Sequence, residues 1–418
     1  MKKVRNSLCF RKKGCCKNGN AGWFKRTRFI LLLGALTSLI PFTIDMYLPS
    51  FPSLAKVFET NASSIQLSLT ACLLGLAVGQ LIAGALSDVH GRRKPLVISL
   101  FLYAAASAAC IFAPNIYLFV VLRFLQGFAA SAGLVISRAI VRDVSSGAEL
   151  TRLFALLMVV NNLVPLLAPS VGSGVLLFAD WRGVFLALTI LGLVLLLITG
   201  FRLPESLPLE RRVPSNLKAT FSNFAAILKD KQFTGYALAQ GFLIGGVFAY
   251  VSGTPFIYQN IYGVSPQVFS LLFGMNGIGL IAGSYAVGRF SHVFSEKRFL
   301  ETALYSATAA GAVLLAVVIL QGPLWAVVVP IFFFVTAIGV VGTASFTLAM
   351  ESQSQAAGSA SALLGLLPFV LGALSAPLVG IAGEETAVPM GMTIFAMCLI
   401  ALLAYLFLVK RTAKAAVR

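Results

Sequence analysis

Long apolar runs separated by short polar segments make up most of the chain. In its first half, runs of roughly 17 to 28 residues, long enough to cross a hydrocarbon core of ~30 Å as helices, cover positions 28–48, 65–87, 96–114, 116–140, 151–177 and 183–201. In its second half, runs of the same kind cover positions 233–257, 267–289, 299–320, 323–350, 356–382 and 388–409. A helix satisfies its backbone hydrogen bonds internally, as hydrocarbon requires, so the pattern predicts twelve membrane-spanning helices and an all-α membrane protein.

A polar, basic segment rich in proline divides these runs into two sets of six. Within the second set, the turn signal Gln321-Gly322-Pro323 separates two helices in the long apolar stretch from 299 to 350. The predicted organisation is a basic cytoplasmic tail at 1–27, a six-helix bundle at 28–201, a cytoplasmic linker at 202–232, a second six-helix bundle at 233–409 and a cytoplasmic C-terminal tail at 410–418.

Composition and charge agree with a membrane protein and argue against a nucleic-acid partner. Hydrophobic residues make up 58% of the chain and charged residues 11%, while the net charge is +18. If the N-terminus is cytoplasmic, 29 of the 32 Lys and Arg residues fall in cytoplasmic segments; Lys56 and Arg182 fall outside, and Arg123 lies within a helix. This is the positive-inside bias that orients membrane proteins. We therefore expect both termini in the cytoplasm of a bacterial cell, and a chain that spans its inner membrane.

Residues that could support an enzyme, a cofactor or a metal site are scarce. The two histidines lie in loops, and the chain has no glycine-rich phosphate loop ending in Lys and Ser or Thr. The three tail cysteines, Cys9, Cys15 and Cys16, lack a fourth metal ligand at a suitable spacing. We expect no catalytic residues, no cofactor and no metal.

The segment from Gly84 to Pro95, between the second and third predicted helices, reads GALSDVHGRRKP. One acid followed by three cations suits a tight cytoplasmic turn, where the acid holds a helix N-terminus or an arginine and the cations meet lipid headgroups. This string resembles the signature loop of the major facilitator superfamily, although Val89 stands where many relatives carry a cation. The positions that carry the resemblance are Gly84, Asp88, Gly91, Arg92 and Arg93.

Other segments extend the resemblance over nearly the whole chain. The fourth predicted helix contains RFLQGFAA from Arg123, and the fifth contains PLLAPSVGSG from Pro165. The fifth-helix string resembles the antiporter motif of the drug-exporting branches through Pro165, Pro169, Gly172 and Gly174, with Ala168 and Ser173 replacing two glycines. The strings IDMYLPSFP from Ile44 and WRGVF from Trp181 resemble the bicyclomycin-resistance (Bcr/CflA) branch. The resemblance implies a twelve-helix major facilitator fold and a drug:proton antiporter.

Asp45 and Arg123 are the clearest ionisable residues at membrane depth. An acid in the centre of a membrane helix costs about 2.5–3.5 kcal/mol, so its presence needs a reason. One hypothesis is that Asp45 carries a proton while Arg123 biases its protonation or holds the backbone of a neighbouring helix; the family's equivalent arginine is implicated in proton coupling. The alternatives are that Asp45 is a solvated cap at the outer end of its helix, and that Arg123 forms a structural pair that never changes state.

A substrate path is expected between the two halves, near the middle of the bilayer. Aromatic and apolar walls with few polar groups suit lipophilic, partly cationic compounds, whereas each polar group taken alone could equally serve packing between helices. The candidate lining residues are Tyr47, Asn161, Gln240, Tyr250, Asn276 and Tyr285, beside Phe248 and Phe273.

The sequence thus predicts a proton-coupled exporter of drug-like or toxic small molecules that works by alternating access, with the loop at Gly84 to Lys94 latching the cytoplasmic side. Its expected partners are a small-molecule substrate, protons and the lipid bilayer, and we expect a monomer. The alternative is an importer or uniporter of a small metabolite, in which Asp45 recognises the substrate without carrying protons.

Overall fold

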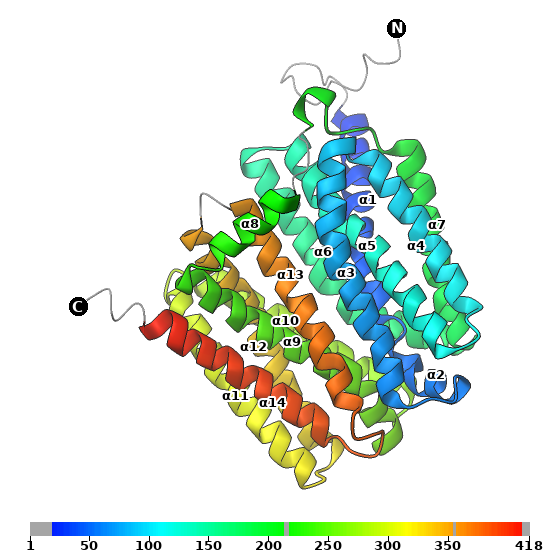
Figure 1. The fold of residues 1–418 in the computed structure, drawn as a ribbon, viewed down its shortest axis with the longest axis vertical. Helices are drawn as coiled ribbons and strands as arrows, with labels where there is room; N and C mark the ends of the chain where they lie inside the picture. Colours follow the sequence, from blue (N-terminus) through cyan, green and yellow to red (C-terminus); the bar gives the residue numbers. More distant parts are fainter. Residues whose placement is uncertain (1–18, 213–216, 354–356, 412–418) are drawn as a thin grey trace.

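The computed structural model describes residues 19–212, 217–353 and 357–411, and these residues form helices joined by turns (Figure 1). The elements of the first half are α1 (Gly19–Asp45), η1 (Leu48–Ser50), α2 (Phe51–Val57), α3 (Ala62–His90), α4 (Arg93–Ile111), α5 (Ile116–Val144), α6 (Gly147–Val175) and α7 (Trp181–Arg202). Then follow η2 (Leu209–Arg211), α8 (Leu217–Ile227), α9 (Lys231–Phe256), η3 (Ile257–Ile261), α10 (Pro266–Phe290), α11 (Glu296–Ile319), α12 (Leu324–Ser352), α13 (Ala357–Ser375), η5 (Ala376–Gly380), α14 (Val388–Ala404) and η6 (Tyr405–Lys410).

Twelve helical segments in the described residues are long and apolar enough to span a membrane, which confirms the predicted number. The first span, Phe29–Val57, combines α1, η1 and α2; the seventh, Lys231–Ile261, and the last, Val388–Lys410, also join two elements each. The turn predicted at Gln321-Gly322-Pro323 separates α11 from α12, and Gln321 takes a positive φ of 51° there. The basic linker contains the 11-residue helix α8.

Polar residues directly before the apolar runs explain where several helices begin. The side chain of Asn61 accepts a hydrogen bond from the Ser64 N–H at 2.9 Å and caps α3. Asp230 caps α9 in the same way through the Gln232 N–H, at 2.9 Å. Such caps satisfy backbone N–H groups that the first helical turn leaves free.

The first span breaks where α1 ends, at Asp45. An α-helix that continued would need the N–H of residue 49 to bond to the Asp45 carbonyl, and Pro49 has none. The chain instead turns through η1 and resumes as α2. The break places the acidic side chain at the end of a helix.

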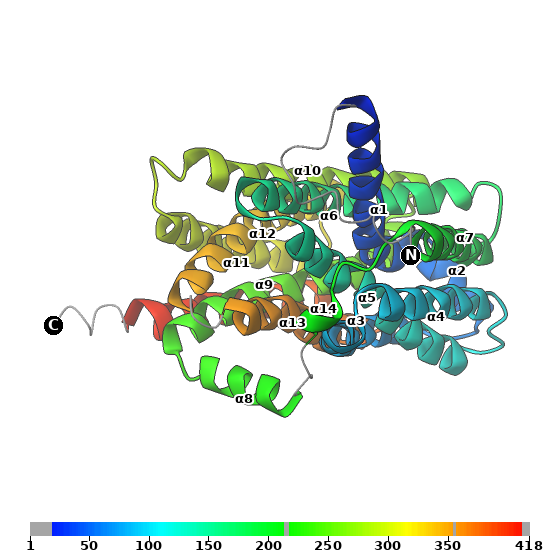
Figure 2. The same ribbon diagram turned by 90° about the horizontal axis from the view of Figure 1, so that it is seen from above.

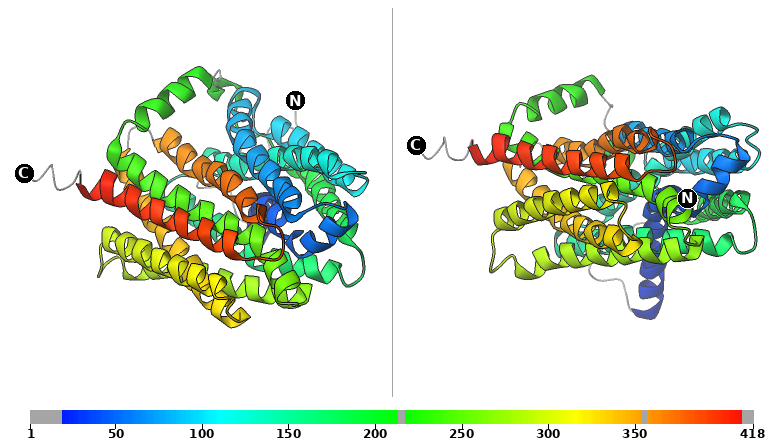
Figure 3. Two further views of the ribbon diagram at one scale, coloured as in Figure 1. Left: turned by 60° about the horizontal axis from the view of Figure 1, so that its bottom comes forward. Right: turned by 90° about the horizontal axis from the view of Figure 1, so that it is seen from below.

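The spans form two bundles, which we call the N bundle (α1 to α7) and the C bundle (α9 to α14). Figure 2 and Figure 3 show α8 outside both bundles, and it packs beside α13. The described chain begins and ends at one end of the bundles, called here the terminal end; the opposite end, where α3 begins and α9 finishes, is the distal end.

Hydrogen bonds join the two bundles at the distal end. The Gln66 side chain of α3 donates to the Ser252 carbonyl of α9 at 3.2 Å, and the Ser270 hydroxyl of α10 donates to the Pro169 carbonyl of α6 at 2.9 Å. The rings of Phe51 and Phe256 meet there as well, with centroids 5.8 Å apart. From this junction the helices of the C bundle incline away from those of the N bundle in Figure 1.

Candidate functional site

Asp45 is buried between the two bundles without a partner. Its side chain is 6% exposed, and no hydrogen bond or ion pair in the part of the chain that the structure describes involves it. Across the interface, the hydroxyl of Tyr250 on α9 lies close enough to interact electrostatically with the carboxyl group. The acid is therefore enclosed in this conformation, and its surroundings supply no cation.

Tyr250 lies opposite Asp45 and contacts Phe273 and Asn276, and we call these three C-bundle residues the Tyr250 cluster. The Asn276 amide donates to the Tyr250 hydroxyl at 2.9 Å, and the Tyr250 ring stacks on Phe273 with centroids 5.2 Å apart. Asn276 is 1% exposed, and its carbonyl oxygen has no hydrogen-bond partner among the described residues. The cluster thus combines an aromatic face with a free acceptor.

Arg123 does not contact Asp45 in this structure. Its fully buried guanidinium donates to the Thr43 carbonyl of α1 at 2.8 Å and to the Gln126 side chain, and it lies over the Tyr47 ring, 4.0 Å from the centroid. All of these partners are neutral. Arg123 therefore holds the backbone of α1 two residues before the acid, which is the geometry of one of the three roles considered from the sequence.

A buried polar chain extends from Arg123, and sequence analysis did not assign its other members. Gln126 donates to the Ser107 hydroxyl at 2.7 Å, while the hydroxyls of Thr43 and Tyr103 lie 2.9 Å apart. Gln126 stands three residues after Arg123, a spacing at which helical side chains meet, so this contact was open to prediction. Ser107 and Tyr103 lie on another helix, and no sequence signal relates them to Arg123.

The other candidate path residues lie apart from the Tyr250 cluster. Tyr47 is fully buried in the N bundle, edge-on to Phe51 and beneath Arg123. Gln240 precedes Tyr250 by ten residues on α9, which places it about 15 Å nearer the terminal end. Its carbonyl oxygen also has no hydrogen-bond partner within the described ranges. Asn161 is half-buried on α6, on the terminal side of Gly172. Tyr285 is 68% exposed on α10.

The signature loop is held by an ion-pair network at the terminal end of the N bundle. The Arg92 guanidinium pairs with Asp88 at 2.5 Å and with Asp143, at the end of α5, at 2.9 Å. The expected contact between helices is thus made by Arg92, while Asp88 pairs within its own turn. Burial alone would lower the pKa of Arg92, but its hydrogen bonds to Asp143 and Asp88 outweigh burial and raise that pKa, so the cation is permanent.

Glu205 closes the same network. Its carboxylate accepts hydrogen bonds from the backbone N–H groups of Arg92 at 2.7 Å and Arg93 at 3.1 Å, and so caps α4. Gly91 takes a φ of 86° just before this cap, a conformation that residues with a side chain rarely adopt.

The other glycine of the signature loop, Gly84, lies one turn before Asp88 on α3 and faces Val135. Sequence analysis missed both Asp143 and Glu205; their only signal was acidity within otherwise basic segments.

The candidate antiporter motif lies between α1 and α10. Pro165 and Pro169 both fall inside α6, and the Pro169 carbonyl accepts the bond from Ser270 described above. Gly172 faces the carbonyl of Met46 so closely that an added Cβ atom would overlap it. Gly174, one half-turn further on, faces open space. The motif thus contains one glycine in tight contact with the end of α1 and one without contact.

Twelve spanning helices in two bundles, meeting around a buried acid and a polar aromatic cluster, define the class of polytopic membrane transporters. The family model for the Major Facilitator Superfamily matches residues 32–377, and the chain belongs to this superfamily, as its signature loop predicts. It is a transporter rather than an enzyme.

Known relatives agree with this assignment. The chain is 54% identical to the uncharacterized MFS-type transporter YdgK of Bacillus subtilis, over 92% of this chain and 96% of that protein. It is 33% identical to the bicyclomycin resistance protein homolog of Haemophilus influenzae, over 92% and 97% of the two chains. These relatives confirm the predicted likeness to the bicyclomycin-resistance branch. The structure of the xylose transporter XylE from E. coli shares the fold, with a TM-score of 0.69 at 15% identity, covering 91% and 96% of the chains.

Proposed function

We propose that the protein exports drug-like small molecules from the bacterial cytoplasm in exchange for protons, by alternating access between the N and C bundles. Three observations support this: the resistance name of the Haemophilus influenzae relative, the buried acid between the bundles, and the concentration of Lys and Arg in segments of the terminal end. That distribution supports a terminal end in the cytoplasm and a protein that spans the cell membrane.

The observation that carries the proposal is the unpartnered burial of Asp45. A lone negative charge is costly in a buried site without a partner, so the Asp45 carboxyl group would hold a proton while it is buried. It would release the proton when the other conformation admits water. Arg123 positions this group, because it fixes the α1 backbone at Thr43. Rocking of the two bundles would change the access of Asp45 to water, and the proton would cross in exchange for the substrate.

The substrate would lie between Asp45 and the Tyr250 cluster. An aromatic face with a free amide acceptor suits a lipophilic compound that carries a hydrogen-bond donor or a positive charge. Because Asn161 and Gln240 lie nearer the terminal end, they would line the way in from the cytoplasm.

The signature loop would latch the terminal end when the distal end opens. Its Arg92–Asp143 pair makes this end of the N bundle rigid. The Asp88 side chain is 54% exposed although it pairs with Arg92, so it would be accessible to a partner from the C bundle in the opposite conformation.

The proposal is tested with an Asp45→Asn variant in proteoliposomes, with ethidium as a fluorescent lipophilic cation and an imposed pH gradient. We expect gradient-driven ethidium transport to be lost and downhill ethidium exchange to remain, because only the proton-carrying atom is removed. Asp180→Asn, at an exposed loop acid, is the matched control and should transport normally. Gradient dependence that survives in Asp45→Asn would reject proton coupling through this residue. Transport by the unmodified protein that does not respond to the pH gradient would instead favour an importer or uniporter.

A further inference from the structure

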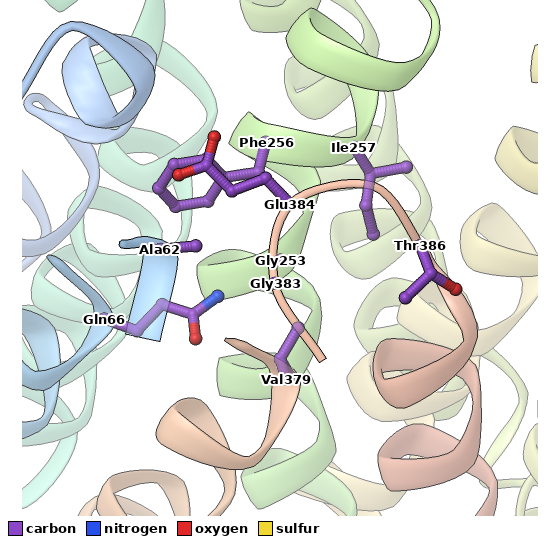
Figure 4. Close-up of a pocket in the computed structure, with 9 residues that line it drawn as sticks. All are labelled: Ala62, Gln66, Gly253, Phe256, Ile257, Val379, Gly383, Glu384 and Thr386. Carbon is purple, nitrogen blue, oxygen red and sulfur yellow. The ribbon is translucent and has the colours of Figure 1, made fainter. Parts of the chain in front are cut away.

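The loop between η5 and α14 lies over the beginning of α3 at the distal end. Figure 4 shows the small pocket between them, lined by Ala62 and Gln66 of α3, by Phe256 of α9, and by Glu384 of the loop. The first two residues belong to the N bundle and the others to the C bundle. The pocket therefore marks a seam between the bundles.

The Glu384 carboxylate reaches across this seam. It accepts a hydrogen bond from the Asn260 side chain at 2.7 Å, and Asn260 lies in the π-helical turn η3 that ends the seventh span. On its other side the carboxylate faces the backbone N–H of Ala62, the first residue of α3, and it interacts with Lys56 of α2. A C-bundle acid therefore lies against the positively polarised start of an N-bundle helix.

Neighbouring contacts show how tightly the first turn of α3 fits the C bundle. Gln66 is 1% exposed and donates to the Ser252 carbonyl across the seam. A Cβ atom added at Gly380 would lie 2.7 Å from the Cα atom of Ser63, so η5 approaches the helix backbone directly. The distal end cannot open without separating this turn from η5 and from Glu384.

We propose that Glu384 is the positioning residue that fastens the distal end of the transport path, by capping α3 from the opposite bundle. The carboxylate of Glu384 lies where it can accept a hydrogen bond from the Ala62 N–H, one of the groups that the helix itself leaves free. Asn260 keeps the carboxylate in place from its own bundle, so the same contact re-forms each time the distal end closes. The proposal rests on the alternating-access part of the proposed function and is independent of proton coupling at Asp45 and of the compound transported.

The test measures how often the distal end opens. Val379 is 4% exposed and lines the pocket, so a Val379→Cys variant carries a thiol that is shielded while the seam is closed. A membrane-impermeant maleimide is added outside intact cells that express the full chain. Mass spectrometry then follows modification of residue 379 separately from the native cysteines.

In this background, Glu384→Ala is expected to raise the labelling rate about fivefold to tenfold, because the side chain that caps α3 and accepts the Asn260 hydrogen bond is lost. Glu384→Gln keeps both acceptor and shape and should stay within about twofold of the parent. Glu385→Ala is the matched control, because its side chain is exposed on the same loop, and it should leave the rate unchanged. The proposal is overturned if Glu384→Ala labels no faster than the parent, or if Glu385→Ala accelerates labelling as much.

A second measurement covers the case in which Glu384→Ala disturbs folding. Hydrogen–deuterium exchange of purified protein in nanodiscs reports the first turn of α3 directly. Faster exchange confined to that turn in Glu384→Ala, restored in Glu384→Gln, supports the cap; faster exchange throughout the C bundle, or none at the turn, contradicts it. Neither readout requires transport, so a failure of proton coupling at Asp45 would leave both results interpretable.

Discussion

Substituting the two glycines of the α6 motif by alanine separates close packing from flexibility. An added Cβ atom at Gly172 would overlap the carbonyl oxygen of Met46, whereas one at Gly174 would have no atom within 4 Å. Both substitutions gain about 1 kcal/mol of helix propensity. Only Gly172→Ala then meets an obstacle, and overpacking of this kind costs about 1–3 kcal/mol.

The obstacle at Gly172 is backbone, so it cannot be relieved by rotating a side chain. α1 itself must move, and Met46 directly follows Asp45. We therefore expect Gly172→Ala to unfold about 2–5 °C below Gly174→Ala, and to lose transport while Gly174→Ala keeps it.

A thermal-shift assay in detergent and ethidium transport in proteoliposomes measure the two effects. Equal melting temperatures for the two variants would refute the packing argument. Loss of transport in both variants, with unchanged stability, would show instead that the helix must flex at either glycine.

Two further predictions concern charged groups near the two ends of the bundles. Asp143→Asn should lower the melting temperature in detergent more than Asp180→Asn does, because Asp143 is paired with the buried Arg92 cation, whereas Asp180 pairs with Arg182 at an exposed site; equal shifts would contradict this. Burial raises the pKa of Glu384 in the closed seam, against the opposing effects of Asn260, Lys56 and the Ala62 N–H. The closed form therefore binds a proton at Glu384 more tightly than the open form does, so a lower external pH favours the closed form. Labelling of Val379→Cys should slow as external pH falls from about 6.5 to about 4.5, when its rate is divided by the rate in the Val379→Cys background that also carries Glu384→Gln. A ratio of the two rates that stays constant over this pH range would exclude the effect.

The spans and many of their ends could be predicted because the signals are local. Apolar runs of sufficient length fix the number of spans, and a residue such as Asn61 or Asp230 before a run supplies the cap that starts the helix. The break at Asp45 could also have been predicted, since Pro49 four residues later removes the required N–H.

The partners within the candidate site could not be predicted, because they lie on different helices. Tyr250 and Asn276 are 26 residues apart, Arg92 and Asp143 are 51 apart, and the rotation of each helix about its own axis decides whether such residues meet. The spacing of apolar residues within one helix does not predict that rotation relative to the other helices. The same limit explains why Glu205 escaped notice, although it caps a helix 112 residues away.

The separation of Asp45 from Arg123 follows from helix geometry and accounts for the unpaired acid. Arg123 reaches the α1 backbone at Thr43, and two residues later an α-helix has turned by about 200°, so the Asp45 side chain points away from the cation that holds its helix. It then faces the C bundle, where Tyr250 offers a hydroxyl in place of a positive charge. A fixed ion pair would lock the acid in one charge state in both conformations. Because Arg123 bonds to the backbone of α1 instead, the Asp45 side chain can respond to the opposite bundle, which proton exchange at this position requires.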